Sequence, residues 1–63
     1  MSDLTPRQRE CMALIDRGFM AKQIGPMLGI SVKTVGCHIE QAVVRLHAKT
    51  TAHAAVLYVR EYE

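Results

Sequence analysis

Sixty-three residues make one small domain, too short to enclose a substrate pocket of roughly several hundred Å³, which argues against an enzyme. The net charge of +2 is too small to identify a partner by itself, and the cysteines, Cys11 and Cys37, form no CxxC pair that would indicate a disulfide-stapled fold. No apolar run approaches the roughly 20 residues of a membrane span and no signal peptide is recognisable, so we expect a cytoplasmic chain with reduced thiols that is stabilised by a partner subunit.

A first helix is expected over residues 6–17. Thr5 and Pro6 are typical of a helix start, because a hydroxyl can cap the unpaired N–H groups and proline lacks the N–H that would stay unpaired there. Gly18 is typical of a helix end, since glycine tolerates the left-handed backbone conformation. Between them, apolar residues recur at the spacing of a buried helix face: Cys11, Met12, Leu14 and Ile15.

A second, shorter helix is expected over residues 21–28, ended by Gly29. Met20 offers no side-chain acceptor, so the start of this helix is poorly capped. Pro26 would remove one backbone hydrogen bond and clash one turn back, at a cost of roughly 3 kcal/mol. Two alternatives follow: the helix is kinked, or it starts late, with Gly25-Pro26 near its first turn. Its inward residues are Ile24 and Leu28.

The stretch Gly29-Ile30-Ser31 predicts a sharp turn into a third helix over residues 32–46, because it combines a glycine, one apolar residue and a serine N-cap. At about 100° per residue, apolar side chains gather on one narrow side of this helix. That side is expected to be core: Val32, Val35, Ile39, Ala42, Val43 and Leu46. The opposite side can enter a groove: Lys33, Thr34, Cys37, His38, Glu40, Gln41, Val44 and Arg45.

A fourth helix over residues 52–61 is expected to start at the hydroxyl caps Thr50 and Thr51. Its apolar side chains cover an arc of about 200°, whereas one docking surface needs only about 100°. The part of the apolar arc that docking on the domain does not need predicts a face for a second subunit, and a symmetric homodimer is the commonest use of such a face. The alternative is a last helix wedged into a cleft of its own domain. The residues expected at the dimer interface are Ala52, Ala55, Val56, Val59 and Tyr62.

Three motifs resemble the LuxR/GerE-type helix-turn-helix family in their order and spacing. Leu4–Glu10 resembles the LTxRExE opening of the family, Leu28–Val35 resembles its LGIS-x-KTV junction, and Lys49–Leu57 resembles the start of its fourth helix. His38 and Leu46 also fall on residues that are usual in the family. The likeness covers essentially the whole chain. Region 4 of bacterial sigma factors is similar over the first three helices but lacks such a fourth helix, so it ranks second.

The resemblance implies an all-α, four-helix domain that binds double-stranded DNA and regulates transcription as a homodimer. In that family the second and third helices form the helix-turn-helix, the third enters the major groove, and the fourth makes the dimer contact. Met1-Ser2-Asp3 looks like a natural start, as in the GerE-like members that stand alone. The residues expected at the phosphate backbone are Lys33, Thr34, His38 (alternatively bonded to a neighbouring backbone group), Arg45 and Lys49. The residues expected to face the bases are Gly36, Cys37, Glu40 and Gln41.

The base-facing positions depart from the family pattern, which often has basic or amide residues there. Gly36 brings no side chain, Cys37 brings a thiol, and Glu40 brings a carboxylate that either accepts from cytosine N4 or repels phosphate. These departures leave a second hypothesis open. The chain is then a protein-interaction module that pairs through its fourth helix with a full-length LuxR-type regulator and blocks its DNA binding.

Metal and enzyme sites are not expected. A zinc site built from the cysteine and histidine side chains would need Cys37 and His38 to share one ion with His47 or His53, but neighbours on a helix diverge by about 100°. The sequence has no glycine-rich phosphate loop, no paired carboxylates in a plausible cleft and no nucleophile with a positioned base. We therefore expect no cofactor, no metal and no catalysis.

Overall fold

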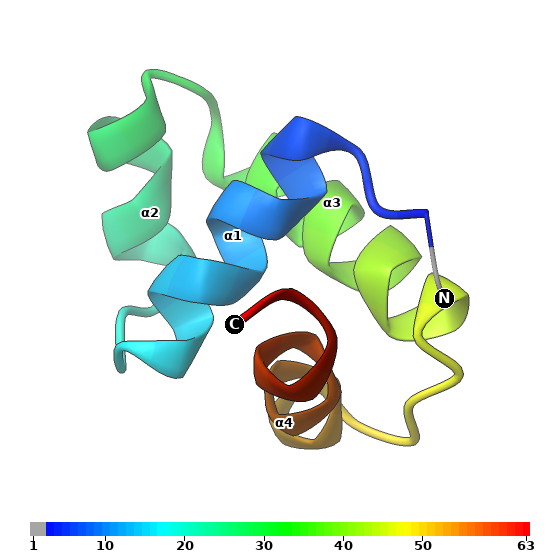
Figure 1. The fold of residues 1–63 in the computed structure, drawn as a ribbon. Coiled ribbons are helices and arrows are strands. Elements are labelled where there is room, and N and C mark those ends of the chain that lie inside the picture. The colour runs from blue at the N-terminus through cyan, green and yellow to red at the C-terminus, as the bar shows by residue number, and fades with distance from the viewer. Residues whose placement is uncertain (1–2) are drawn as a thin grey trace.

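The chain folds into four helices in the computed structural model, which describes residues 3–63. The helices are α1 (Pro6–Asp16), α2 (Ala21–Leu28), α3 (Val32–Arg45) and α4 (Thr51–Tyr62), and this range contains no strand. In Figure 1, α1 crosses the middle of the molecule, with α2 and α4 on different sides of it. The expected all-α, four-helix fold is confirmed, and every helix end lies within one residue of its expected position. Met1 and Ser2, on which the expectation of a natural start rests, lie outside the described residues.

Hydroxyl side chains start three of these helices. Thr5 Oγ1 accepts from the N–H of Gln8 at 3.2 Å, and Gln8 Oε1 accepts in return from the N–H of Thr5 at 3.1 Å. Ser31 and Thr50 cap α3 and α4, each accepting from the N–H three residues later, at 3.1 and 3.0 Å. Because these caps satisfy N–H groups that helix geometry leaves unpaired, the local sequence determines where α1, α3 and α4 begin.

α2 begins at Ala21 and contains Pro26, so the alternative of a late start is wrong. The side chain of Met20 caps nothing, but Gln23 Oε1 accepts from the Met20 N–H at 2.8 Å, a contact that the sequence analysis missed. Pro26 cannot donate to the carbonyl of Lys22. Both residues are exposed, so that carbonyl can bond water instead, which lowers the cost of the proline.

The turn between α2 and α3 is tight. Gly29 adopts a left-handed φ of +70°, as expected for a glycine that ends a helix. The N–H of Ile30 then donates to the carbonyl of Gly25 at 3.0 Å. Two residues after Gly29, Ser31 caps α3, so α3 leaves the turn in a direction fixed by backbone hydrogen bonds.

The core consists of two clusters of buried side chains, which α1 and α3 connect. Within residues 3–63, no Cα atom of α2 lies within 8 Å of a Cα atom of α4. Ile15 and Val43 pack against both clusters. The α4 cluster contains Leu4, Met12, Ala42, Leu46, Ala54, Ala55 and Tyr58. The α2 cluster contains Cys11, Ile24, Val35 and Ile39.

Several expectations about the core were wrong in detail. Val32, expected to point inward, is 47% exposed, because it opens α3 at the edge of the fold, where it lies beside Gly25 of α2. Gln8, to which the apolar pattern gave no place, is only 1% exposed. Four residues expected in the core are half-buried and pack against the clusters from outside: Leu14, Ile15, Leu28 and Val43.

The C-terminal end of α4 is fastened to the start of α1. The N–H of Leu4 donates to the hydroxyl oxygen of Tyr62 at 3.2 Å. The rings of Tyr58 and Tyr62 stack with their centroids 5.3 Å apart, and the guanidinium carbon of Arg9 lies 5.6 Å from the centroid of the Tyr62 ring. Much of the apolar arc of α4 is therefore used inside the domain, as the wedged-helix alternative expected.

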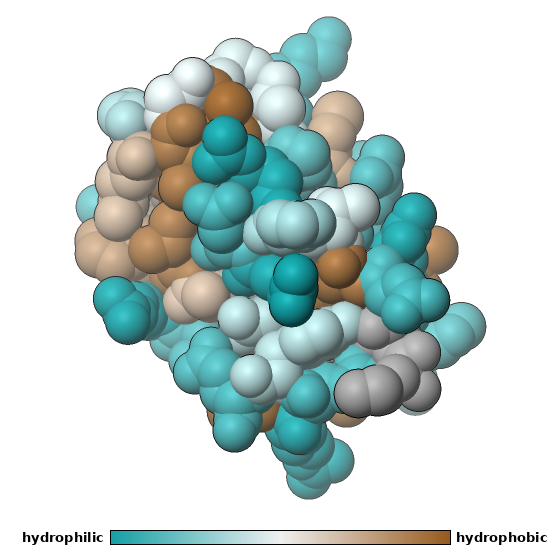
Figure 2. Space-filling model, turned by 45° about the horizontal axis from the view of Figure 1, so that its top comes forward, coloured by the Kyte–Doolittle hydropathy of each residue, from teal (hydrophilic) through white to brown (hydrophobic). Residues whose placement is uncertain are grey.

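The exposed apolar surface is uneven. Figure 2 shows hydrophobic surface gathered on the side where α2 lies, while hydrophilic side chains cover the middle of this face. None of the helices in the described range is long and apolar enough to cross a bilayer. The large apolar side chains that are exposed are Met20, Met27, Val32, Val44 and Val56.

Candidate nucleic-acid interface

α3 is held by the core along one side and is open along the other. Val35, Ile39 and Ala42 are buried and attach the helix to both core clusters. His38 is half-buried at the border of the two sides. The other residues of the outward side (the residues of α3 expected to face away from the core) are all exposed: Lys33, Thr34, Cys37, Glu40, Gln41, Val44 and Arg45.

The start of α3 places unpaired N–H groups beside a cation. Ser31 Oγ lies 2.8 Å from Thr34 Oγ1, so these two hydroxyls bond each other. The N–H groups of Val32 and Lys33 belong to the first turn and have no partner within the helix. The N-terminus of a helix carries partial positive charge, and the exposed Lys33 adds a full one. This end of α3 therefore suits a phosphate oxygen.

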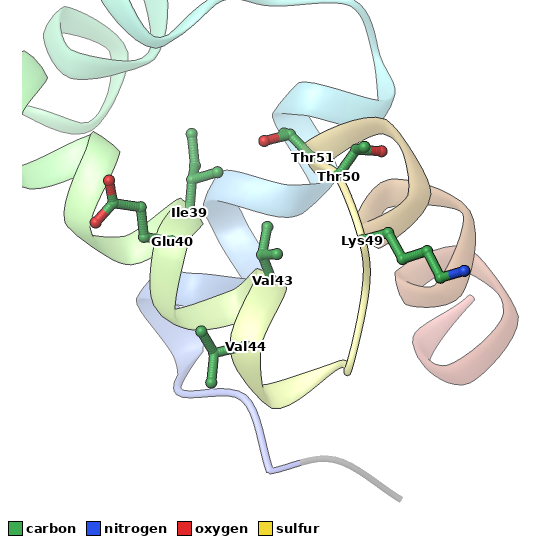
Figure 3. A pocket seen from close by; sticks show the side chains of 7 residues that line it. All are labelled: Ile39, Glu40, Val43, Val44, Lys49, Thr50 and Thr51. Carbon is green, nitrogen blue, oxygen red and sulfur yellow. The ribbon is translucent and has the colours of Figure 1, made fainter.

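At the other end of α3, two residues expected at the DNA backbone also have contacts inside the domain. Arg45 Nη1 donates to the carbonyl oxygen of Asp3 at 2.6 Å, and a guanidinium has further N–H donors to offer. The backbone N–H of Lys49 donates to His53 Nδ1 at 3.1 Å, while its side chain is directed away from Glu40 (Figure 3). Both cationic side chains are exposed.

A shallow hollow lies between α3 and the start of α4 (Figure 3). The hollow is lined by the methyl groups of aliphatic side chains, by two threonine hydroxyls and by the carboxylate of Glu40. It is open to solvent, so it does not enclose a small molecule, but it extends the outward side of α3 toward α4. Its lining residues are Ile39, Glu40, Val43, Val44, Lys49, Thr50 and Thr51.

The middle of the outward side is poor in hydrogen-bond donors. A Cβ atom at Gly36 would meet nothing within 4 Å, Cys37 is an exposed free thiol, and Glu40 is an exposed carboxylate. Val44 is 71% exposed, and the sequence analysis placed it on this side without counting it among the DNA contacts. Valine methyl groups can contact the methyl group of thymine. This surface therefore offers an acceptor and apolar contacts in place of the usual donors.

Gln41 connects the outward side of α3 with α1. Gln8 Nε2 donates to Gln41 Oε1 at 2.8 Å, and Gln8 is buried. The sequence analysis assigned Gln41 to the bases and missed Gln8 altogether. The available signal was the position of Gln8, three residues after the cap Thr5, where its amide oxygen turns back to the start of α1.

The outer face of α4 is narrower than expected. Ala52 and Val56 are exposed, the latter by 53%, and Val59 is half-buried. Ala55 is 8% exposed within the α4 cluster, and Tyr62 is half-buried with its hydroxyl bonded to Leu4. Ala55 has almost no surface to offer a partner, because the domain already covers it. Of the predicted interface residues, Ala52, Val56 and Val59 thus form the accessible part.

The histidine and cysteine side chains are spread over the fold. Within residues 3–63, no three His, Cys, Asp or Glu side chains lie where they could hold one metal ion. His47 lies between α3 and α4 with a left-handed φ of +56°, and His53 Nδ1 is occupied by the Lys49 N–H. Cys11 is buried and Cys37 is exposed, as expected.

Comparison with known proteins gives consistent matches. The sequence matches the family described as bacterial regulatory proteins, luxR family, over residues 2–58. It is 37% identical over 57 residues to a protein of Escherichia coli K12 named as an HTH-type transcriptional regulator, YhjB. It is 35% identical over 49 residues to the tetrathionate response regulatory protein TtrR of Salmonella typhimurium LT2. It is 37% identical over 57 residues to the transcriptional activator protein BjaR1 of Bradyrhizobium diazoefficiens.

These three matches cover 90%, 78% and 90% of this chain. They cover 28%, 24% and 24% of the relatives, so the chain spans about a quarter of the length of these curated proteins.

Proposed function

Because the chain belongs to the luxR family of bacterial regulatory proteins, we propose that it binds duplex DNA and regulates transcription, with α3 in the major groove. The observation that carries the proposal is the exposed outward side of α3, which the core supports from behind. A rigid helix with one open side fits the width of the major groove, about 12 Å.

The contacts divide between phosphates and bases. Phosphate contacts fix position and affinity, and base contacts carry sequence information. Glu40 accepts a hydrogen bond from cytosine N4, and the methyl groups of Val44 contact thymine. The backbone contacts are Lys33 and Thr34 at the start of α3, the half-buried His38, and Arg45 and Lys49 at the far end. Gly36, Cys37 and Gln41 complete the surface that faces the bases.

The proposed functional unit is a homodimer joined through α4. The exposed Val56 and Ala52, with the half-buried Val59 beside them, make a small apolar face that supports this part of the proposal. A two-fold axis through α4 would place the two α3 helices in successive major grooves, about 34–36 Å apart. A palindromic site with half-sites one helical turn apart is the expected target.

A fluorescence anisotropy titration at low salt tests the proposal, using random duplex and promoter-derived duplex. Binding is expected at micromolar protein. The three cations proposed at the phosphates are Lys33, Arg45 and Lys49. Counted on both protomers of a dimer, they give a slope of log K against log salt concentration of about −5. Absence of binding to either duplex at micromolar protein would overturn the proposal.

A second candidate function is the interaction module. The exposed carboxylate of Glu40 and the bare backbone at Gly36 favour it, because both lie where a DNA-binding helix needs attraction. The chain would pair through α4 with a longer luxR-family regulator and hold it off the DNA. Its own affinity for DNA would then be weak.

Glu40→Lys discriminates the two functions. The matched control is Asp16→Lys, which makes the same change of charge at the exposed end of α1, away from the outward side of α3. If the chain is an interaction module, Glu40→Lys creates DNA binding that the native chain lacks, and Asp16→Lys does not. If the chain is a DNA-binding regulator, the native chain already binds. Glu40→Lys then steepens the salt slope only where position 40 faces phosphate, by about two units for a dimer that gains one cation on each protomer.

A further inference from the structure

We infer that Gln8 is a positioning residue for DNA recognition: from inside the domain, it turns the amide of Gln41 so that its oxygen points inward and its NH₂ group faces outward. This inference rests on the proposed DNA binding. It concerns a side chain of α1 that is too buried to touch DNA and a side chain of α3 that is exposed on the outward side.

The orientation of both amides follows from the identity of the donors. The backbone N–H of Thr5 can only donate, so the Gln8 atom 3.1 Å from it must be the oxygen, Oε1. The other end of the Gln8 amide is therefore Nε2, which lies 2.8 Å from Gln41. Because Nε2 also can only donate, Gln41 must meet it with Oε1. The Nε2 of Gln41 is left as the end of that amide directed away from Gln8.

Burial keeps this arrangement in place. Gln8 is 1% exposed, so water cannot replace either of its partners. A turned Gln8 amide would set its NH₂ against the Thr5 N–H and its oxygen against the Gln41 oxygen, leaving buried polar atoms unpaired. In the present arrangement, every buried side-chain nitrogen or oxygen atom on the buried and half-buried residues of the range 3–63 has a hydrogen-bond partner. The first turn of α1 thus fixes a side chain on α3.

The consequence is a specific limit on what Gln41 recognises. A glutamine reads adenine with both amide ends, donating to N7 and accepting from N6. Here the oxygen is directed at Gln8 Nε2 and the NH₂ group is the end directed away from it, so Gln41 offers its two N–H donors and recognises hydrogen-bond acceptors: a phosphate oxygen, or an acceptor atom on a base edge. It supplies a donor on a surface whose middle is otherwise poor in donors.

Gln8→Glu tests the inference without changing α3. A carboxylate accepts from the Thr5 N–H as before but cannot donate, so Gln41 turns its NH₂ inward and its oxygen toward DNA. We expect affinity for duplex DNA to fall about tenfold, as for a lost hydrogen bond together with an acceptor brought near phosphate. The same substitution in a Gln41→Ala chain controls for the added negative charge, and there it should change affinity less than about twofold.

The outcomes separate this inference from the proposed function. A native chain that binds no duplex overturns the proposed function. A native chain that binds, with Gln8→Glu equally harmful in both backgrounds, overturns the inference. A Gln41→Ala chain that binds as well as the native one overturns it too. If Gln41→Ala lowers affinity for ordinary duplex but not for a duplex whose phosphates are replaced by neutral methylphosphonates, the partner of Gln41 is a phosphate. If the loss of affinity depends instead on the identity of one base pair, the partner is a base edge.

A measurement on the native protein covers the case in which Gln8→Glu does not fold. In side-chain ¹⁵N NMR spectra without DNA, the NH₂ protons of Gln8 should exchange slowly with water and those of Gln41 rapidly. A through-bond coupling from Gln8 Nε2 to the amide carbon of Gln41 would support the inference. The reverse coupling, from Gln41 Nε2 to Gln8, would overturn it.

Discussion

A Cβ atom built on Gly25 would lie 2.9 Å from the carbonyl oxygen of Ile30 and 3.4 Å from a methyl carbon of Val32. The backbone of α2 therefore packs directly against the turn that leads into α3. Gly25 is a mid-helix glycine because no side chain fits between the two. This close approach helps to set the direction in which α3 leaves α2.

Gly25→Ala should lower the stability of the domain, although alanine is the better helix former by about 1 kcal/mol. The new methyl group must displace a backbone carbonyl, and overpacking of this kind costs about 1–3 kcal/mol. Thermal unfolding followed by circular dichroism checks this. Gly36→Ala is the matched control, because open space surrounds that position, and it should raise stability by up to about 1 kcal/mol. Equal shifts of Tm in the two variants would contradict the packing argument.

Tyr62→Phe should lower the free energy of unfolding by about 0.5–1.5 kcal/mol, because the N–H of Leu4 loses its acceptor. The ring remains, so its stacking on Tyr58 and its contact with Arg9 are retained. Urea denaturation measures the change. An unchanged midpoint would mean that water replaces the hydroxyl at no cost.

Stability should fall as pH rises above about 10, partly through Tyr58. Burial raises the pKa of the Tyr58 hydroxyl above its ordinary value, and the nearby Glu63 carboxylate raises it further. The unfolded chain therefore loses this proton first, which favours unfolding between the two pKa values, while the contribution is fully present at lower pH. The stability advantage of the native chain over Tyr58→Phe, measured in urea, should shrink from pH 8 to pH 11. A constant difference would show that the hydroxyl ionises alike in both states.

The two thiols should differ sharply in reactivity. Cys37 is exposed, whereas Cys11 is fully buried and burial raises its pKa, which keeps the reactive thiolate scarce. Ellman's reagent should modify one thiol per native chain quickly and the second only after unfolding. Cys37→Ser should abolish the fast phase. Excess duplex DNA should slow that phase in the native chain, and an unchanged rate would argue against α3 in the groove.

Val56→Glu should dissociate the proposed dimer. A carboxylate forced into an apolar interface without a partner costs about 3 kcal/mol, which weakens association roughly 100-fold. Light scattering should report a mass near the 7.0 kDa of the single chain. Met27→Glu is the control, since Met27 is also exposed but lies on α2. A native chain that is itself monomeric at high micromolar concentration would remove α4 as the interface.

Local chemistry made much of the fold predictable. Thr5, Ser31 and Gly29 act within a few residues of themselves, through a hydroxyl cap or a left-handed backbone, so sequence alone locates the helix ends they set. The apolar spacing of α3 likewise placed Ile39 in the core and Glu40 outside it. Neither conclusion needs knowledge of distant residues.

What sequence could not supply depends on partners far along the chain. Gln8 is buried because Gln41, 33 residues later, accepts its hydrogen bond. Ala55 is covered because α4 docks on α1, and no periodicity distinguishes that use of an apolar arc from a dimer face. Val32 sits on the apolar side of α3 but at its very end, where the fold leaves it half uncovered.

The division of the core into two clusters has a consequence for how such a domain diversifies. Among the half-buried apolar residues of the described chain, only Ile15 and Val43 pack against both clusters, and the backbones of α2 and α4 stay more than 8 Å apart, Cα to Cα. If α4 makes the proposed dimer contact, mutations that repack the α4 half can change that contact while the α2–α3 corner keeps its shape. Selection could then act on the proposed assembly and on the proposed DNA contact as nearly separate traits within sixty-three residues.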